Sequence, residues 1–259
     1  MKEALVVITI GEKYKKEYQR NFFQSHQKFS QKNNLDIIIV SDYIEETSKH
    51  PSWQKLLIFR HPEVKKYERI LLIDADIYIT KQAENPLKEV PAGLYGATKN
   101  NAYNLASLGK SDPTLYDGMD NPPEFVLNGG FLILEKNIHQ NMMEEIFYKY
   151  PERICFEQGP LSYHLLKNYK GVVLSSKFNT IITSYREYAG RGLSILREMY
   201  EENYFLHFAS GINKNILSII RFLDSREKKS FSYKMFSLIS NKKLEKILTP
   251  IAQLLAKIN

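Results

Sequence analysis

Two aspartates separated by a single residue, Asp74 and Asp76, are the side chains in this sequence best placed for chemistry. They follow an apolar run over residues 70–73 that is typical of a strand buried on both faces. If the chain stays extended through them, side chains two residues apart leave the same face, and both carboxylates point the same way. Two negative charges that lie so close to each other repel unless a cation lies between them. The pair is therefore a candidate divalent-metal site, and the alternative is a solvated turn that happens to be acidic.

Strands and helices are expected to alternate around this pair. The patterns predict strands over residues 4–10 and 35–40, with helices over 13–31 and 52–59, before the central strand. This order, with short links, is typical of an α/β fold with a mostly parallel sheet flanked by helices. Ligands of such sheets bind beyond the carboxyl ends of the strands, where Asp74 and Asp76 stand. Farther along, we expect strands over 93–97, 125–134, 171–174, 180–184 and 204–208, and helices over 138–150 and 157–167.

The composition is that of an ordinary globular protein, with 43% hydrophobic and 25% charged residues in 259. A single cysteine, Cys155, excludes an internal disulfide and a cysteine-rich zinc site, and it fits a reducing compartment such as the cytoplasm. The first apolar run is short and contains no small-residue cleavage site, so it predicts a buried strand rather than a signal peptide. No apolar run approaches the roughly 18 residues of a membrane span, so we do not expect an integral membrane protein.

The net charge of +7 is concentrated near the carboxyl-terminal end. Residues 213–259 contain ten Lys or Arg against three acidic residues, whereas residues 1–212 are balanced. We therefore expect a globular domain over 1–212 and a basic helical tail over 213–259. Apolar residues recur at helical spacing from Leu244 to Ile258, and Pro250 forces a kink or a restart. Such a tail either lies on an anionic membrane, which predicts a peripheral protein at the inner face of the cell membrane, or packs on the domain.

The acidic pair stands within a series of short motifs that resembles the metal-dependent nucleotide-sugar glycosyltransferases of the GT-A (Rossmann-like) fold. The resemblance covers roughly residues 4–215 and is greatest to glycosyltransferase family 8, which includes glycogenin and bacterial lipopolysaccharide galactosyltransferases. It implies that Asp74, Ala75 and Asp76 form the donor-side metal motif and that His207 is the third metal ligand. The implied ion is Mn²⁺ (or Mg²⁺). Carboxylate oxygens with one imidazole suit Mn²⁺, whereas structural zinc calls for thiolates or more histidines.

The same resemblance assigns residues to the nucleotide of the donor. At the end of the first strand, Thr9, Gly11 and Tyr14 match positions that hold the nucleoside, and the Tyr14 ring matches an aromatic that stacks on uracil. A ring offers a base a π-face worth roughly 1–3 kcal/mol. The alternative is a tyrosine on a helix surface. Lys55 matches a basic residue near the donor phosphates, and the alternative is a solvated lysine.

Further matches lie beside the transferred sugar and the leaving group. Asn128, followed by two glycines, resembles a position that binds sugar hydroxyls while the glycines let the sugar lie against the backbone. Glu157 and Gln158 match an acid that binds the donor sugar and a glutamine close to the reacting carbon. Downstream, Gly211 and Lys214 resemble the end of the family's His-Phe motif, which is one residue longer here, and Lys214 is implied to clamp the leaving diphosphate.

The resemblance implies a hexosyltransferase that uses a UDP-hexose and a saccharide or lipid-linked saccharide acceptor, with retention of anomeric configuration, in bacterial surface polysaccharide or lipopolysaccharide synthesis. An inverting enzyme with Glu157 or Glu124 as base is the alternative within this class. A sugar-nucleotide pyrophosphorylase would need a glycine-rich phosphate loop after the first strand, which the sequence lacks. A basic-tailed nucleic-acid or membrane-binding protein without catalysis is the alternative from another class. We expect no nucleic-acid partner, because the aromatics of the neutral domain are not interleaved with basic residues.

Overall fold

The computed structural model describes residues 1–100, 124–152, 156–182, 192–209 and 214–225. The chain divides into two compact units, and it passes from one to the other more than once. The first unit consists of Met1–Ala75 and Asn85–Phe178, and the second contains Asp76–Glu84 and the described residues from Asn179 onward. The chain therefore leaves the first unit between Asp74 and Asp76.

A six-stranded sheet forms the centre of the first unit, with the strand order β2-β1-β3-β6-β5-β7. Strand β1 pairs in parallel with β2 and β3, and β5 pairs in parallel with β7, whereas β6 runs antiparallel to both of its neighbours. The prediction of an α/β fold with a mostly parallel sheet is confirmed. The strands are β1 (Glu3–Ile8), β2 (Asp36–Val40), β3 (Arg69–Asp74), β5 (Tyr95–Lys99), β6 (Leu127–Glu135) and β7 (Gly171–Leu174).

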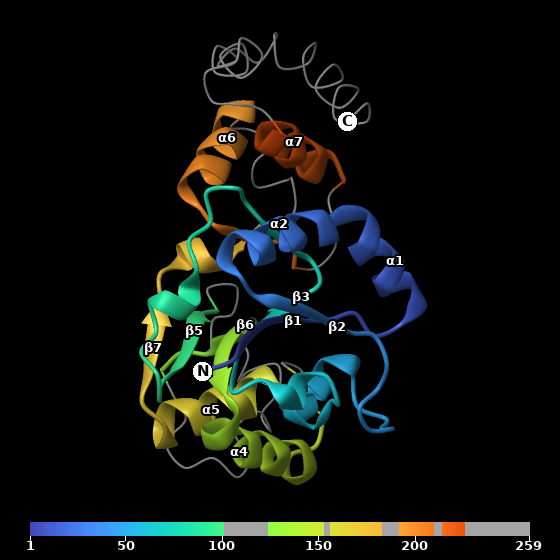
Figure 1. Cartoon of the computed structure of the whole chain (residues 1–259), viewed down its shortest axis with the longest axis vertical. Coiled ribbons are helices and arrows are strands. Elements are labelled where there is room, and N and C mark those ends of the chain that lie inside the picture. Colours follow the sequence, from blue (N-terminus) through green and yellow to red (C-terminus); the bar gives the residue numbers. More distant parts are fainter. Residues whose placement is uncertain (101–123, 153–155, 183–191, 210–213, 226–259) are drawn as a thin grey trace. The chain divides into compact units, whose positions relative to one another are not determined.

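Helices cover both faces of this sheet. Helices α1 (Glu12–Asn21) and α2 (Phe23–Asn33) lie on one face, and α4 (Lys136–Lys149) and α5 (Gln158–Asn168) lie on the other (Figure 1). The 3₁₀ helix η1 (Pro51–Arg60) packs against α4. Covered on both sides, β1 and β3 consist almost entirely of buried aliphatic residues, which explains their unbroken apolar runs. Shorter 3₁₀ turns are η2 (Val64–Lys66), η3 (Pro86–Lys88) and η5 (Ser176–Phe178).

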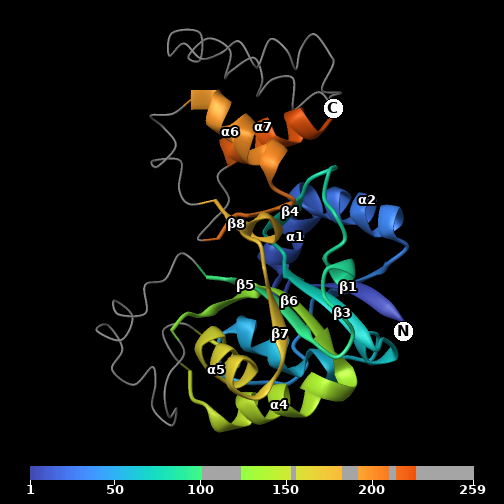
Figure 2. The ribbon, with the colours of Figure 1, turned by 90° about the vertical axis from the view of Figure 1, so that its left-hand side faces the viewer.

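The second unit has its own small sheet and helix pair. Strand β9 (Phe205–His207) lies between β4 (Ile77–Ile79) and β8 (Thr180–Ile181). Helices α6 (Gly192–Glu202) and α7 (Lys214–Ser225) lie side by side (Figure 2). The Asp224 carboxylate accepts hydrogen bonds from the Tyr200 hydroxyl (2.9 Å) and the Lys81 backbone N–H (2.8 Å). These contacts attach α7 to α6 and to the segment that follows β4.

Some local expectations differ from the structure. The helix expected over 13–31 is two helices, because Phe22 leaves the helical conformation (φ −124°) and accepts a hydrogen bond from the Ser25 hydroxyl at the start of α2. The stretch from Asp74 to Asp76 is not extended, because β3 ends at Asp74 and a turn follows before β4. Helix α6 was not expected at all.

The expected boundary near residue 212 stays a prediction. Helix α7 includes the apolar run 216–223, whereas the stripe from Leu244 to Ile258 lies outside the described residues. Among the helices that the structure describes, none combines the length and the apolar character needed to cross a membrane.

Candidate active site

The carboxyl ends of three parallel strands meet at one edge of the first unit's sheet. Asp74, the last residue of β3, is paired in register with Ile8, the last residue of β1. The next residue, Thr9, is buried, and its hydroxyl lies 3.0 Å from that of Ser41, just beyond β2. Strand β6 runs the other way, so its first residues also lie at this edge. Polar side chains from distant parts of the sequence are thereby gathered where open α/β sheets bind ligands.

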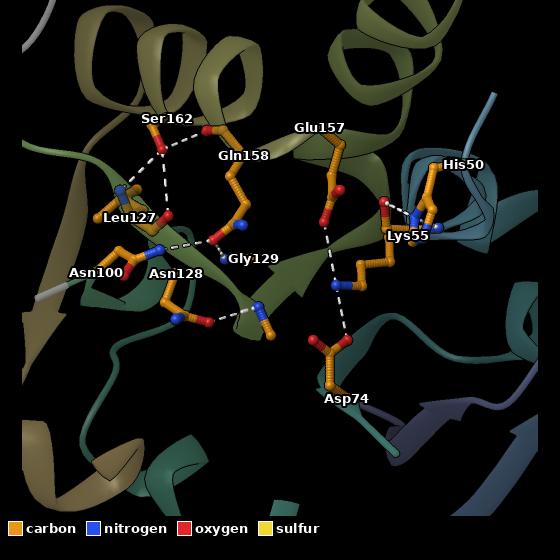
Figure 3. A network of polar contacts seen from close by, with 12 residues as sticks. His50, Lys55, Asp74, Asn100, Leu127, Asn128, Gly129, Glu157, Gln158 and Ser162 are labelled. Carbon is orange, nitrogen blue, oxygen red and sulfur yellow. Dashed lines mark hydrogen bonds and ion pairs between the residues drawn. The ribbon is translucent and has the colours of Figure 1, made fainter. Parts of the chain in front are cut away.

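The ammonium group of Lys55 joins two carboxylates at this edge (Figure 3). Its Nζ lies 2.7 Å from Asp74 Oδ1 and 3.1 Å from Glu157 Oε1. The side chains of Lys55 and Glu157 are 7% and 1% exposed, and that of Asp74 is 27% exposed. Burial lowers the pKa of Lys55, but the two carboxylates outweigh burial, and the net effect is a raised pKa. Lys55 therefore stays charged and holds Asp74 by one carboxylate oxygen.

This contact gives Lys55 a partner that the resemblance did not imply. Lys55 contacts the carboxylates of Asp74 and Glu157, and a contact with donor phosphates stays a prediction. Glu157 is correspondingly enclosed, and its Oε2 is buried with no hydrogen-bond partner among the described residues. A carboxylate this buried and ion-paired is badly suited to act as a base toward an acceptor. Glu124, the other candidate base, is exposed.

Gly129 is required for the close packing of α5 against β6. A Cβ on this residue would lie 2.8 Å from Glu157 Oε1 and 2.8 Å from Gln158 Cγ. The Gly129 N–H donates to Gln158 Oε1 (3.1 Å), which also accepts from Asn100 Nδ2 (3.0 Å) just beyond β5 (Figure 3). In this structure the glycine accommodates protein side chains, whereas its expected role was to let a sugar approach the backbone.

The neighbouring polar groups are also fixed by the backbone of β6. Asn128 is buried, and its Oδ1 accepts from the Gly130 N–H (2.8 Å). The Ser162 hydroxyl accepts from the Leu127 N–H (2.8 Å) and donates to the Gln158 carbonyl (2.6 Å). These bonds tie the first turn of α5 to the start of β6. They hold Asn128 and Gln158 at the same edge of the sheet as Asp74.

Asp76 and His207 lie together in the second unit. His207 Nε2 is 3.3 Å from Asp76 Oδ1, and the Phe208 N–H donates to the Asp76 carbonyl (2.9 Å). His207 ends β9, where it is paired with Ile77 of β4 on one side and Ile181 of β8 on the other. Its side chain is 6% exposed, and that of Asp76 is 35% exposed. The imidazole is thus a buried group on the central strand of the small sheet, and it faces a partly exposed carboxylate.

The side chain of Asn179 decides which imidazole nitrogen faces Asp76. Asn179 Oδ1 lies 3.0 Å from His207 Nδ1 and is an acceptor, so Nδ1 carries the proton of that hydrogen bond. In the neutral imidazole Nε2 is then also an acceptor, and two acceptors 3.3 Å apart repel unless a proton or a cation lies between them. Two ligand atoms that bind an ion at right angles, each about 2.1 Å from it, lie about 3.0 Å apart. This value is close to the 3.3 Å between His207 Nε2 and Asp76 Oδ1.

Asp74, Asp76 and His207 are a group that could hold a metal ion, since each offers one ligand atom. Asp74 lies two residues before Asp76 in the chain, and Ala75 stands between them in the turn. Two carboxylates and one imidazole suit Mn²⁺ or Mg²⁺ better than a structural zinc. The side chains present therefore fit the ion that the resemblance implies.

The remaining predicted residues lie at the start of α1 and around the start of α7. Gly11, at the start of α1, has φ +98°, a conformation that favours glycine. Tyr14 is 61% exposed on α1, so its ring is accessible, as a base-stacking residue must be. Lys214 is the first residue of α7, and Gly211 lies outside the described residues.

Sequence reasoning missed Asn179 and Asn100. Each stands directly beside a strand and hydrogen-bonds a predicted site residue, His207 and Gln158 respectively. A lone asparagine has no spacing pattern, so only the three-dimensional arrangement identifies it.

Comparison with known proteins finds likeness in structure and not in sequence. No family model matches the chain, and no curated protein matches it. A glycosyltransferase involved in the glycosylation of the major capsid of PBCV-1 matches with a TM-score of 0.56 and 11% identity, over 84% of this chain and 98% of that one. The bifunctional glycosyltransferase WbbM in its apo form matches with a TM-score of 0.54 and 12% identity, over 92% of this chain and 51% of that one. The chain thus spans about half the length of WbbM and has the fold of solved glycosyltransferases.

Proposed function

We propose that this protein is a glycosyltransferase that transfers a hexosyl group from a nucleoside-diphosphate sugar, a UDP-hexose, to a saccharide or lipid-linked saccharide acceptor. The observation that carries the proposal is the pair of Asp76 and His207, with the imidazole turned toward the carboxylate by Asn179. Asp76 follows the end of β3 and His207 ends β9, in a fold found in solved glycosyltransferases. The family 8 type of enzyme, implied by the motifs, is part of the proposal.

In this proposal Asp74, Asp76 and His207 hold a divalent cation, Mn²⁺ or Mg²⁺. When bound, such an ion stabilises the negative charge that develops on the departing diphosphate. Lys55 fixes one oxygen of Asp74 through a 2.7 Å ion pair, so the orientation of this carboxylate is set before substrate binds. Lys214 adds positive charge for the diphosphate, and Thr9, Gly11 and Tyr14 bind the nucleoside.

Asn128 and Gln158 are proposed to contact the transferred sugar. The amide oxygen of Gln158 is already occupied by Gly129 and Asn100, so the Nε2 group is the end of this side chain available to donate to a sugar oxygen. Glu157 acts in this scheme through Lys55 and not as a base. The proposal includes retention of anomeric configuration, as the resemblance implies, and ¹H NMR of the first product formed would distinguish it from inversion.

The test begins with binding and then measures turnover. We expect UDP plus Mn²⁺ to raise the melting temperature and EDTA to abolish the shift. Hydrolysis of a panel of UDP-sugars in the presence of Mn²⁺ then identifies the donor. The variants Asp76→Asn and His207→Ala are expected to lose at least tenfold in rate, because each removes a ligand of the ion, and 1.36 kcal/mol of barrier is tenfold. A UDP shift that is unchanged by EDTA, with full activity in both variants, would contradict the proposal.

Membrane attachment through residues 213–259 and a role in surface polysaccharide synthesis on the cytoplasmic side stay parts of the proposal. Flotation with anionic liposomes of the full chain, with its Lys and Arg residues after 225 exchanged for Gln in the control, tests the attachment. Equal flotation of both proteins would remove it.

A further inference from the structure

We infer that Asn179 is a positioning residue for metal binding, which orients the His207 imidazole and fixes its tautomer. This inference rests on the proposed function, since it concerns the same group of ligands. Its basis is the 3.0 Å contact between Asn179 Oδ1 and His207 Nδ1, in which both side chains are at least nine-tenths buried. The motifs of the sequence do not include Asn179.

The backbone of the small sheet brings Asn179 to the imidazole. Asn179 directly precedes β8, and this strand pairs in parallel with β9, with Ile181 opposite His207. The Ile182 N–H donates to the His207 carbonyl (2.7 Å), so the register of β8 is fixed at the histidine itself. Asn179 itself lies in the bend that leads into β8, and its Oδ1 is 3.0 Å from His207 Nδ1. The register therefore places the Asn179 amide beside His207 Nδ1.

The consequence for the metal is chemical. A histidine binds a metal ion through a nitrogen without a proton, and the hydrogen bond made by the other nitrogen decides which one that is. With the Nδ1 proton donated to Asn179, the lone pair of Nε2 faces Asp76. Without the amide oxygen, the Nδ1 proton loses this acceptor, and part of the population then presents a protonated nitrogen to the ion. Removal of such a partner typically weakens metal affinity about 10- to 100-fold.

The chain offers a matched control in Asn203. This residue belongs to the same unit, and its side chain accepts from the Thr180 hydroxyl (2.7 Å) and donates to the Met199 carbonyl (2.7 Å). It therefore supports β8 and the end of α6, and the hydrogen bonds that the structure describes for it go to Thr180, Met199, Gln82 and Thr80. Asn203→Ala reports what the loss of a half-buried, hydrogen-bonded asparagine does to this unit in general.

The experiment measures the dissociation constant of Mn²⁺ alone, by electron paramagnetic resonance of the free ion, for the full chain without substrate. We expect Asn179→Ala to bind Mn²⁺ about 10- to 100-fold more weakly, Asn203→Ala to bind like wild type, and Asn179→Asp to restore affinity, because a carboxylate accepts the same hydrogen bond. The inference is overturned if Asn179→Ala binds as tightly as wild type, or if Asn203→Ala weakens binding equally. Should Asn179→Ala not fold, Asn179→Asp binding more weakly than wild type would overturn it too. Wild-type protein without Mn²⁺ affinity would instead contradict the metal in the proposed function.

Discussion

Removal of the Lys55 ammonium is the sharpest test of how the first unit holds Asp74. The substitution Lys55→Met keeps most of the aliphatic volume and deletes the charge. It leaves Glu157, 1% exposed, and Asp74, 27% exposed, without their shared cation. Loss of one partner of a buried ion pair costs about 3–5 kcal/mol, because the other charge stays buried and unpaired. We expect a loss of this size in the free energy of unfolding.

A second substitution separates the charge from the packing. In Lys55→Met combined with Glu157→Gln, the buried carboxylate is replaced by a neutral amide of similar shape. The double variant is therefore expected to recover much of the loss and to lie within about 2 kcal/mol of wild type, as a neutral replacement of a buried pair often does. The difference between the double variant and the sum of the single variants gives the coupling energy.

Urea unfolding followed by the fluorescence of Trp53 suits this cycle, because Trp53 is the single tryptophan, is fully buried and lies in η1 with Lys55. A surface pair supplies the control. Lys66 lies 2.6 Å from Glu63, and both side chains are more than half exposed, so Lys66→Met is expected to leave the free energy of unfolding nearly unchanged. A loss below about 1 kcal/mol in Lys55→Met, or a double variant no more stable than Lys55→Met, would refute the reasoning.

Three further predictions concern single positions. Gly129→Ala places a methyl group 2.8 Å from Glu157 Oε1, and we expect a loss of about 1–3 kcal/mol in urea unfolding together with a severe loss of transferase activity; wild-type behaviour in both would contradict the packing described. Tyr14→Ala removes an exposed ring, so we expect unchanged stability and a UDP affinity at least about fivefold weaker by calorimetry, with Tyr14→Phe unaffected. Burial lowers the pKa of His139 to about 4, so the unfolded chain takes up this proton at higher pH than the folded one. Stability is therefore expected to fall by about 3 kcal/mol as the pH drops from about 6.5 to 4, and His139→Gln removes that part of the fall; an unchanged pH dependence in the variant would contradict it.

The sequence was most informative where burial is complete. The apolar runs of β1 and β3 predicted buried strands, and an apolar run needs no knowledge of its neighbours to be recognised. The pair of Asp76 and His207 was expected from the resemblance, and the structure finds the two side chains in contact. The expected extended geometry at Asp74 and Asp76 was wrong, because Ala75 and Asp76 form a turn. The spacing of two aspartates does not show that the chain passes here from the six-stranded sheet, which contains β3, to the three-stranded sheet, which contains β4.

Sequence patterns could not predict which side chains from distant segments contact the site residues. Lys55 was expected near phosphates, and its contacts with Asp74 and Glu157 depend on how η1 and α5 pack on the sheet. No element was expected over the residues that form helix α6. Asn179 becomes meaningful only through the register of β8 on β9.

The separation of β4 from β9 along the chain has a consequence for biosynthesis. Strand β4 pairs with β9, so Asp76 acquires its imidazole neighbour only after His207 has been synthesised. While the ribosome is still translating the segment between them, the growing chain has the acidic pair but not the histidine. Closing so long a loop is entropically costly, and it is compensated only when the small sheet assembles. In the proposed function, capture of the ion is then a late event of maturation, and a nascent chain stalled before residue 207 is expected to bind Mn²⁺ far more weakly than the finished protein.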